Sequence, residues 1–305
     1  MEIKLEKETE INGASPHIAL VAVQLMFGTF PVVGKVVLQV IPSVALVGFR
    51  VGIAAAILYG FQRFGGNLRL AKPSDYYRLA LMSLFGVVFN QLLFVTGLSL
   101  TKAANTSLLS VTIPIFTILI GTALGSERIS FRKAVGIALA AAGVLILIDP
   151  TSAAFSSETK VGDFLIILNS FSYGIYVASS KDVITRNGAL KSITWIFMFA
   201  AIVTVPVGLF SLSAVDISGV APLIWLLVVH VAVFGTAAPY MLNAWALARV
   251  SPSTVAVYIY LQPIIGFLSA AVFLGENIGL KFIGSAALIF AGVFLVTRKH
   301  IPASK

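Results

Sequence analysis

The sequence contains no cysteine and few charged residues. Without cysteine, the chain can have no disulfide bond, no thiol nucleophile and no metal centre with cysteine ligands. Charged residues make up 11% of the chain, whereas roughly 25% is usual in soluble globular proteins. Hydrophobic residues make up 58%, and a soluble fold of 305 residues could not bury so much apolar surface. The composition therefore indicates an integral membrane protein.

Carboxylates are missing from the middle of every long apolar segment, so a proton relay built on buried Asp or Glu has no candidate. The motifs of common enzymes are missing as well: there is no H-E-x-x-H, no phosphate-binding loop and no thiol. We therefore predict no catalytic residue, no metal site and no cofactor, and expect a protein that is not an enzyme. The basic residues lie between apolar segments and form no single patch, which argues against a nucleic-acid partner.

The chain is rich in apolar segments long enough to cross a bilayer, which takes about 20 residues for a helix. They lack the two-residue alternation of barrel strands, so we predict an all-α membrane protein with ten transmembrane helices. If the N-terminus is cytoplasmic, sixteen of the 21 Lys and Arg residues fall on the cytoplasmic side of the cell membrane, as do both termini. The expected spans are 17–40, 43–63, 77–99, 103–125, 132–149, 162–182, 191–212, 221–247, 252–275 and 279–298.

The two halves of the chain resemble each other at a nearly constant offset of 146 to 149 residues. Because each half has five spans, the second must insert upside down relative to the first, and such inverted repeats are typical of secondary transporters. The matched positions include Lys35 with Lys181, Pro114 with Pro263, and Glu127 with Glu276. The predicted organisation is a cytosolic tail (1–16), a first repeat (17–149), an extracytoplasmic linker (150–161), a second repeat (162–298) and a cytosolic tail (299–305).

The repeats resemble EamA domains, the units of the drug/metabolite transporter superfamily. The resemblance rests on "GTFPVVGK", on "LVGFR", and on "AANTSLLSVTIPIFTILIGTALGSERIS" with its second copy, and it covers about residues 17–298. Phe27 and Gly28 stand where members often carry Trp–Gly. The resemblance implies ten helices around a central cavity, alternating access, and often export of amino acids or other metabolites. A small-molecule metabolite and the lipid bilayer are thus the expected partners, and small residues in the fifth and tenth spans are compatible with a monomer or a homodimer.

Polar and aromatic side chains within the spans are candidates for the wall of such a cavity. Tyrosine joins a flat apolar face to a hydrogen-bonding tip, which suits mixed metabolites. Three candidates in the sixth span share one helical face at i, i+4 and i+7. A single histidine deep in a span either relays protons or stays neutral and hydrogen-bonded. The predicted substrate-binding residues are Gln24, Arg50, Asn90, Gln91, Asn169, Tyr173, Tyr176, His230, Tyr240 and Tyr258, and Asn243 and Gln262 belong to the same polar set.

Lys35 and Arg50 lie inside apolar spans. Lys35 has a repeat counterpart, which favours a structural role. Arg50 has none, because the matching region near Phe197 is apolar. We expect Arg50 to receive a substrate carboxylate or phosphate, or to hold carbonyl groups freed by Pro31. The predicted gating and structural residues are Lys35, Pro114, Glu127, Lys181, Pro263 and Glu276, with Arg128, Arg132 or Lys133 as expected partners of Glu127.

These observations predict a secondary transporter that moves a small organic metabolite, an amino acid or similar compound, across the cytoplasmic membrane by alternating access, in the direction of export. An alternative is a carrier or exchanger for nucleotide sugars or sugar phosphates, because two cations with no carboxylate nearby could meet a multiply charged substrate. A membrane receptor or scaffold that transports nothing is the remaining class.

Overall fold

The computed structural model describes residues 2–148, 157–213, 217, 219–274 and 279–298. Throughout this part of the chain the regular secondary structure is helical, which confirms the predicted all-α class. The elements are α1 (Glu2–Val37), α2 (Ser43–Gly65), α3 (Pro73–Ser83), η1 (Leu84–Phe89), α4 (Asn90–Leu100), α5 (Ala103–Leu109), α6 (Thr112–Ala123), α7 (Phe131–Ile148), α8 (Lys160–Asn187), α9 (Ala189–Leu212), α10 (Pro222–Ala232), η2 (Val233–Ala237), α11 (Ala238–Leu247), α12 (Pro252–Val257), η3 (Tyr258–Leu261), α13 (Gln262–Leu274) and α14 (Leu280–Thr297).

Nine segments among the described residues are long and apolar enough to cross a membrane. In the region of the ninth predicted span, the structure has a shorter apolar helix, Pro252–Leu268, so ten spans remain a prediction. The first helix begins at Glu2, within the predicted tail 1–16, and its membrane-length part is Ala14–Val37. Glu276, residues 149–156 of the predicted boundary and linker, and the tail 299–305 lie outside the described residues.

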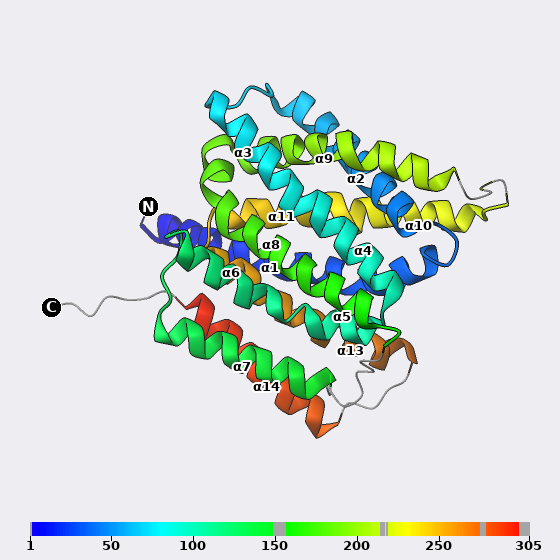
Figure 1. Ribbon diagram of the computed structural model, residues 1–305. Coiled ribbons are helices and arrows are strands. Elements are labelled where there is room, and N and C mark those ends of the chain that lie inside the picture. Colours follow the sequence, from blue (N-terminus) through cyan, green and yellow to red (C-terminus); the bar gives the residue numbers. More distant parts are fainter. Residues whose placement is uncertain (1, 149–156, 214–216, 218, 275–278, 299–305) are drawn as a thin grey trace.

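Two pairs of helices form the edges of the bundle. Figure 1 shows α7 beside α14 at one edge and α2 beside α9 at the other, with α1, α8 and α11 between them. Glycine allows both pairs to pack closely: a Cβ atom at Gly136 would lie 2.8 Å from the carbonyl oxygen of Gly292, and one at Gly48 would lie 2.9 Å from that of Thr204. In lipid, such close approach supplies the van der Waals contact that holds helices together.

The third and eighth predicted spans are interrupted at matching places. Each contains a π-helical segment, η1 in the third span and η2 in the eighth. Both segments carry the dipeptide Phe–Gly, at Phe85–Gly86 and at Phe234–Gly235, 149 residues apart. Single-turn π-helical segments are rare and often mark functional sites, because they free backbone groups and redirect side chains.

The fourth and ninth predicted spans are broken just before the matched prolines. Pro114 follows the break between α5 and α6, and Pro263 follows the 3-10 segment η3. Proline cannot donate to the carbonyl four residues earlier. The carbonyl of Ser110 instead accepts the N–H of Ile113, and that of Ile259 accepts the N–H of Gln262. Each proline thus coincides with a local tightening of its helix.

One end of the bundle is held by a bidentate ion pair. Arg186, at the end of α8, donates to Asp75 of α3 at 2.8 and 3.1 Å. The Nδ2 group of Asn187 also donates to Asp75. Gly188 then adopts a φ of +83°, which lets the chain pass directly from α8 into α9.

Candidate functional site

A cavity lies between the helices of the two halves, and its atom-free space, counted together with the open solvent that it includes, is about 790 Å³. Its walls come from α1, α2, α4, α5 and α6 of the first half and from α8, α11, α12, η3 and α13 of the second. The predicted substrate-binding residues that line it are Gln24, Arg50, Asn90, Gln91, Asn169, Tyr173 and Tyr240, together with Asn243 and Gln262 of the same polar set. Residues far apart in the sequence thus meet in one cavity.

The hydroxyl group of Tyr240 contacts three other polar groups at the wall of the cavity. It lies 2.7 Å from Asn90 Oδ1 and 3.0 Å from the carbonyl oxygen of Gly86, and it accepts the Nε2–H of Gln91 at 3.1 Å. Asn169 donates to the backbone carbonyl of Asn90 at 2.8 Å. Because Gly86 belongs to η1, the π-helical segment offers one of its carbonyl groups to this network.

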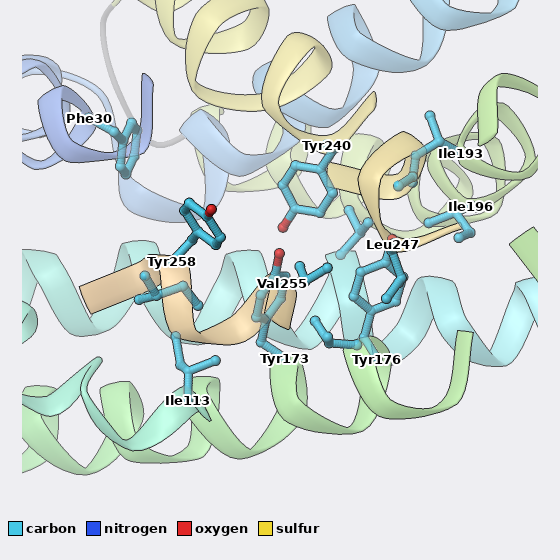
Figure 2. Packing of buried hydrophobic residues seen from close by; sticks show 14 of the residues in the cluster. Phe30, Ile113, Tyr173, Tyr176, Ile193, Ile196, Tyr240, Leu247, Val255 and Tyr258 are labelled. Carbon is cyan, nitrogen blue, oxygen red and sulfur yellow. The ribbon is translucent and has the colours of Figure 1, made fainter. Parts of the chain in front are cut away.

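Two further hydrogen-bonded pairs of side chains line the cavity, one within the second half and one between the halves. Asn243 Nδ2 donates to the hydroxyl of Tyr173 at 2.5 Å, and Gln262 Nε2 donates to Gln24 Oε1 at 2.8 Å. Figure 2 shows the hydroxyl groups of Tyr173 and Tyr240 pointing toward one another from α8 and α11. Apart from Arg50, the polar side chains of the wall are neutral hydrogen-bonding groups, which suit a solute with several polar atoms.

Arg50 lies in the wall and is only 2% exposed. Its Nε donates to Thr236 Oγ1 at 2.9 Å, and its Nη2 donates to the carbonyl of Gly235 at 2.8 Å. Its guanidinium lies over the ring of Phe30, 4.1 Å from the centroid. The carbonyl that it holds belongs to η2, which corrects the expectation that it would hold carbonyl groups freed by Pro31. In the described part of the chain, Nη1 has no hydrogen-bond partner.

Three aromatic rings that are not among the predicted substrate-binding residues complete the cavity. Phe30 and Phe94 line it with their ring centroids 5.7 Å apart. Phe27 lines it as well and meets Tyr240 edge-on. Phenylalanines are common throughout the apolar spans, so only their place in the fold distinguishes these three. The repeated Phe–Gly dipeptides of η1 and η2 were a signal in the sequence that could have pointed to this region.

Three predicted substrate-binding residues lie outside the cavity. Tyr176 is buried behind the wall, 5.7 Å from the ring of Tyr173. Tyr258 is buried and its hydroxyl lies 2.8 Å from His17 Nδ1. His230 is exposed on the outside of the bundle, where its ring lies against Phe234.

Lys35 and Lys181 make equivalent contacts in the two halves. Lys35 Nζ donates to the carbonyl of Thr101 at 2.8 Å, just before α5. Lys181 Nζ donates to the carbonyl of Val250 at 2.7 Å, just before α12. Each lysine therefore ties its helix to the loop that precedes the next broken span, and neither lines the cavity.

Glu127 connects the two halves at one end of the bundle. It is 7% exposed and forms an ion pair with Lys133 at 2.5 Å, which confirms one of the expected partners. Its Oε2 accepts the backbone N–H of Ser253 at 2.8 Å, and its Oε1 accepts the Ser253 hydroxyl. Ser253 lies in the first turn of α12, where backbone N–H groups that lack an acceptor within the helix favour an anion.

The described residues contain no group of three or more His, Asp or Glu side chains arranged to hold a metal ion. The cavity offers hydrogen bonds, aromatic faces and one guanidinium. Such an arrangement can bind and orient a small molecule.

Comparison with known proteins gives a consistent result. The sequence profile of the EamA-like transporter family matches residues 14–149 and again residues 160–298. An uncharacterized transporter of Archaeoglobus fulgidus is 26% identical over 94% of this chain and 99% of its own length. A probable amino-acid metabolite efflux pump of Escherichia coli is 28% identical over 59% of this chain and 62% of its own length. A solved crystal structure has the same fold, with a TM-score of 0.76 at 16% identity, over 92% of this chain and 96% of that one.

Proposed function

Because the chain belongs to the EamA-like transporter family, whose members matched above are transporters and not enzymes, we propose that it is an exporter of a small organic metabolite. In this proposal it is a secondary transporter of the cytoplasmic membrane, acts by alternating access, and works as a monomer or homodimer. One relative is named as a probable amino-acid metabolite efflux pump, which supports an amino acid or a similar compound as the substrate.

The observation that carries this proposal is the cavity shared by the two halves. Its hydrogen bonds cross from one half to the other, as in the pairs Gln24–Gln262 and Asn90–Tyr240. If one half rocks against the other, these contacts form and break together with access to the cavity. A binding site between two moving bodies is what alternating access requires.

Matched contacts support an arrangement of ten spans as two inverted repeats, 17–149 and 162–298. The lysine contacts of Lys35 and Lys181 are equivalent, as described above. Gly86 faces the ring of Tyr176, and a Cβ atom there would lie 2.5 Å from it. Gly235 faces the ring of Phe30 in the same way, with a Cβ distance of 3.1 Å. The ranges matched by the family profile support the same division.

The proposed orientation has both termini in the cytoplasm and the linker 150–161 outside. Figure 1 supports it, because α14 ends on the side of the bundle at which α1 begins. The excess of Lys and Arg on that side follows the usual charge bias of cytoplasmic loops.

Nucleotide sugars and sugar phosphates have less support as substrates. Such compounds carry two or more negative charges and would need at least two cations. Lys35 is engaged by a backbone carbonyl outside the cavity, so Arg50 is the cation left for the substrate among the described lining residues.

Transport in liposomes tests the proposal. The purified protein is reconstituted, and efflux of a panel of labelled amino acids and other metabolites is measured against protein-free liposomes. We expect saturable efflux of at least one organic metabolite. Binding without any saturable flux would favour a receptor or scaffold and would refute the transporter proposal. Competition by nucleotide sugars alone would favour that alternative.

A further inference from the structure

The cavity wall contains a charge that the protein itself does not balance. Arg50 is 2% exposed, and its neighbours are a hydroxyl, a carbonyl and an aromatic ring. The ion pairs Lys133–Glu127 and Arg186–Asp75 do not involve Arg50, and neither of its hydrogen bonds goes to a carboxylate. A guanidinium removed from water without an anionic partner is costly to the protein, and such charges in membrane proteins usually mark a ligand site.

The geometry leaves one nitrogen of the guanidinium without a hydrogen-bond acceptor. Thr236 and Gly235 accept from Nε and Nη2, which fixes the plane of the group. Nη1 belongs to a residue that lines the cavity, and it is buried without a hydrogen-bond partner in the described part of the chain. A buried donor left without an acceptor loses its hydration and gains nothing in exchange. An oxygen atom of a bound anion would supply both the acceptor and the charge.

The rest of the cavity is neutral. Its other polar side chains are amides, hydroxyl groups and phenols, and no Asp or Glu is found among the described residues that line it. A substrate ammonium group would find amide oxygens and aromatic faces there but no carboxylate. Phe30, which lies beside Arg50, and its neighbour Phe94 offer an apolar surface, and Phe27 lines the same cavity.

From these observations we propose that the cavity selects organic molecules with one negative charge and an apolar or aromatic body, with Arg50 as the residue that binds the carboxylate. Its role in transport rests on the proposed function, but the selectivity is a property of the cavity and can be measured by binding. A zwitterionic amino acid or an organic cation should bind less tightly than an anion of the same shape, because its ammonium group has no anionic partner.

Matched ligands test the selectivity in the unmodified protein. Binding of phenylpropanoate, phenylpropanamide, phenylalanine and phenethylamine, and of the smaller pairs lactate and lactamide, is measured by calorimetry on protein in lipid nanodiscs. One charge-assisted hydrogen bond predicts that a carboxylate binds about tenfold more tightly than its amide. We expect phenylpropanoate to bind more tightly than phenylalanine, and phenethylamine to bind least tightly. Equal affinity of each acid and its amide would overturn the proposal, as would tighter binding of the zwitterion or the cation.

Substitution of the arginine assigns the effect to a residue. Arg50→Gln keeps hydrogen-bonding capacity without the charge and should abolish the preference for the acid over the amide. Arg50→Lys keeps the charge and should retain part of the preference. Arg63→Gln removes an exposed arginine from the same helix and is the matched control, with the preference expected to remain. A full preference in Arg50→Gln would overturn the role of this residue. If Arg50→Gln does not fold, the acid and amide comparison in the unmodified protein still decides the selectivity.

The two proposals can fail separately. Saturable flux restricted to neutral or zwitterionic metabolites would overturn the anion selectivity and leave the transporter proposal standing. Selective binding of monocarboxylates with no saturable flux of any compound would leave the selectivity standing and overturn the transporter proposal.

Discussion

At the scale of single residues, the hydroxyl group of Tyr240 joins three parts of the cavity wall. It contacts Asn90, Gln91 and the carbonyl of Gly86; Tyr240, Gln91 and Gly86 are buried, and Asn90 is partly buried. The ring itself packs edge-on against Phe27 and against Phe197. The hydroxyl and the ring therefore have separable roles, one in the polar network and the other in packing.

Tyr240→Phe removes the hydroxyl and keeps the ring. The partners would be left unsatisfied, so we expect a loss of about 1–3 kcal/mol in the free energy of unfolding. We also expect reduced flux, measured in liposomes beside thermal unfolding in detergent. Tyr77→Phe, at a residue 74% exposed on α3, is the control and should change neither quantity. An unchanged melting temperature and unchanged flux in Tyr240→Phe would contradict this role for the network.

The sequence identified which residue types could line a binding cavity, but it was less informative about which side chains point into that cavity. Polar side chains are rare in apolar spans, so Gln24, Asn90 and Gln91 could be identified as candidates from their chemistry alone. The sequence does not determine which face of a helix points toward the cavity. Tyr176 and His230 both lie on faces that point away from it. The binding roles of the residues that do line it stay predictions until a ligand is found.

At the scale of elements, the two π-helical segments shape the cavity from opposite halves. Gly86 of η1 offers its carbonyl to Tyr240, and Gly235 of η2 offers its carbonyl to Arg50. The same two glycines face aromatic rings at short range. A Cβ atom at Gly86 would collide with the ring of Tyr176, whereas one at Gly235 would require the ring of Phe30 to shift slightly.

The loss of stability caused by an alanine substitution should depend on the space available at each glycine. A Cβ atom at Gly86 would lie 2.5 Å from the ring of Tyr176, one at Gly235 would lie 3.1 Å from that of Phe30, and one at Gly60 would meet nothing within 4 Å. We expect Gly86→Ala to cost about 1–3 kcal/mol of stability, as overpacking usually does, and Gly235→Ala to cost less. Gly60→Ala is the control and should not lower the melting temperature in detergent. A melting temperature for Gly86→Ala equal to that of the control would refute this ranking.

Element boundaries were predictable only in part. Long apolar segments predict spans because a helix must satisfy its backbone within the bilayer. The breaks near Pro114 and Pro263 were predictable, because a proline has no N–H group to donate to the carbonyl four residues earlier. A π-helical segment has no comparable residue requirement, because it depends on the side chains that pack against it from other helices. The gating roles of the two prolines stay predictions.

At the scale of the whole molecule, the contact between Glu127 and Ser253 links the halves at the proposed cytoplasmic end. Glu127 precedes α7 in the first half, and Ser253 opens α12 in the second. Seen from the proposed cytoplasmic end, the cavity lies behind this contact, because Val255, two residues after Ser253 in α12, is among its lining residues. If the halves rock, this contact must break before the cavity can open to the cytoplasm. We infer that it holds that end closed.

The absence of native cysteine makes this testable with a single label. Val255→Cys is introduced alone and together with Glu127→Gln, and its reaction with an impermeant maleimide added from the cytoplasmic side is followed over time. Loss of the carboxylate charge weakens the contacts with Ser253 and Lys133, so we expect labelling to become about tenfold faster, the change that roughly 1.4 kcal/mol would produce. Asp182→Asn, at an exposed carboxylate near the same end, should leave the rate unchanged. Equal labelling rates with and without Glu127→Gln would mean that closure of this end is maintained by the apolar packing of the halves, without a contribution from the ionic contact.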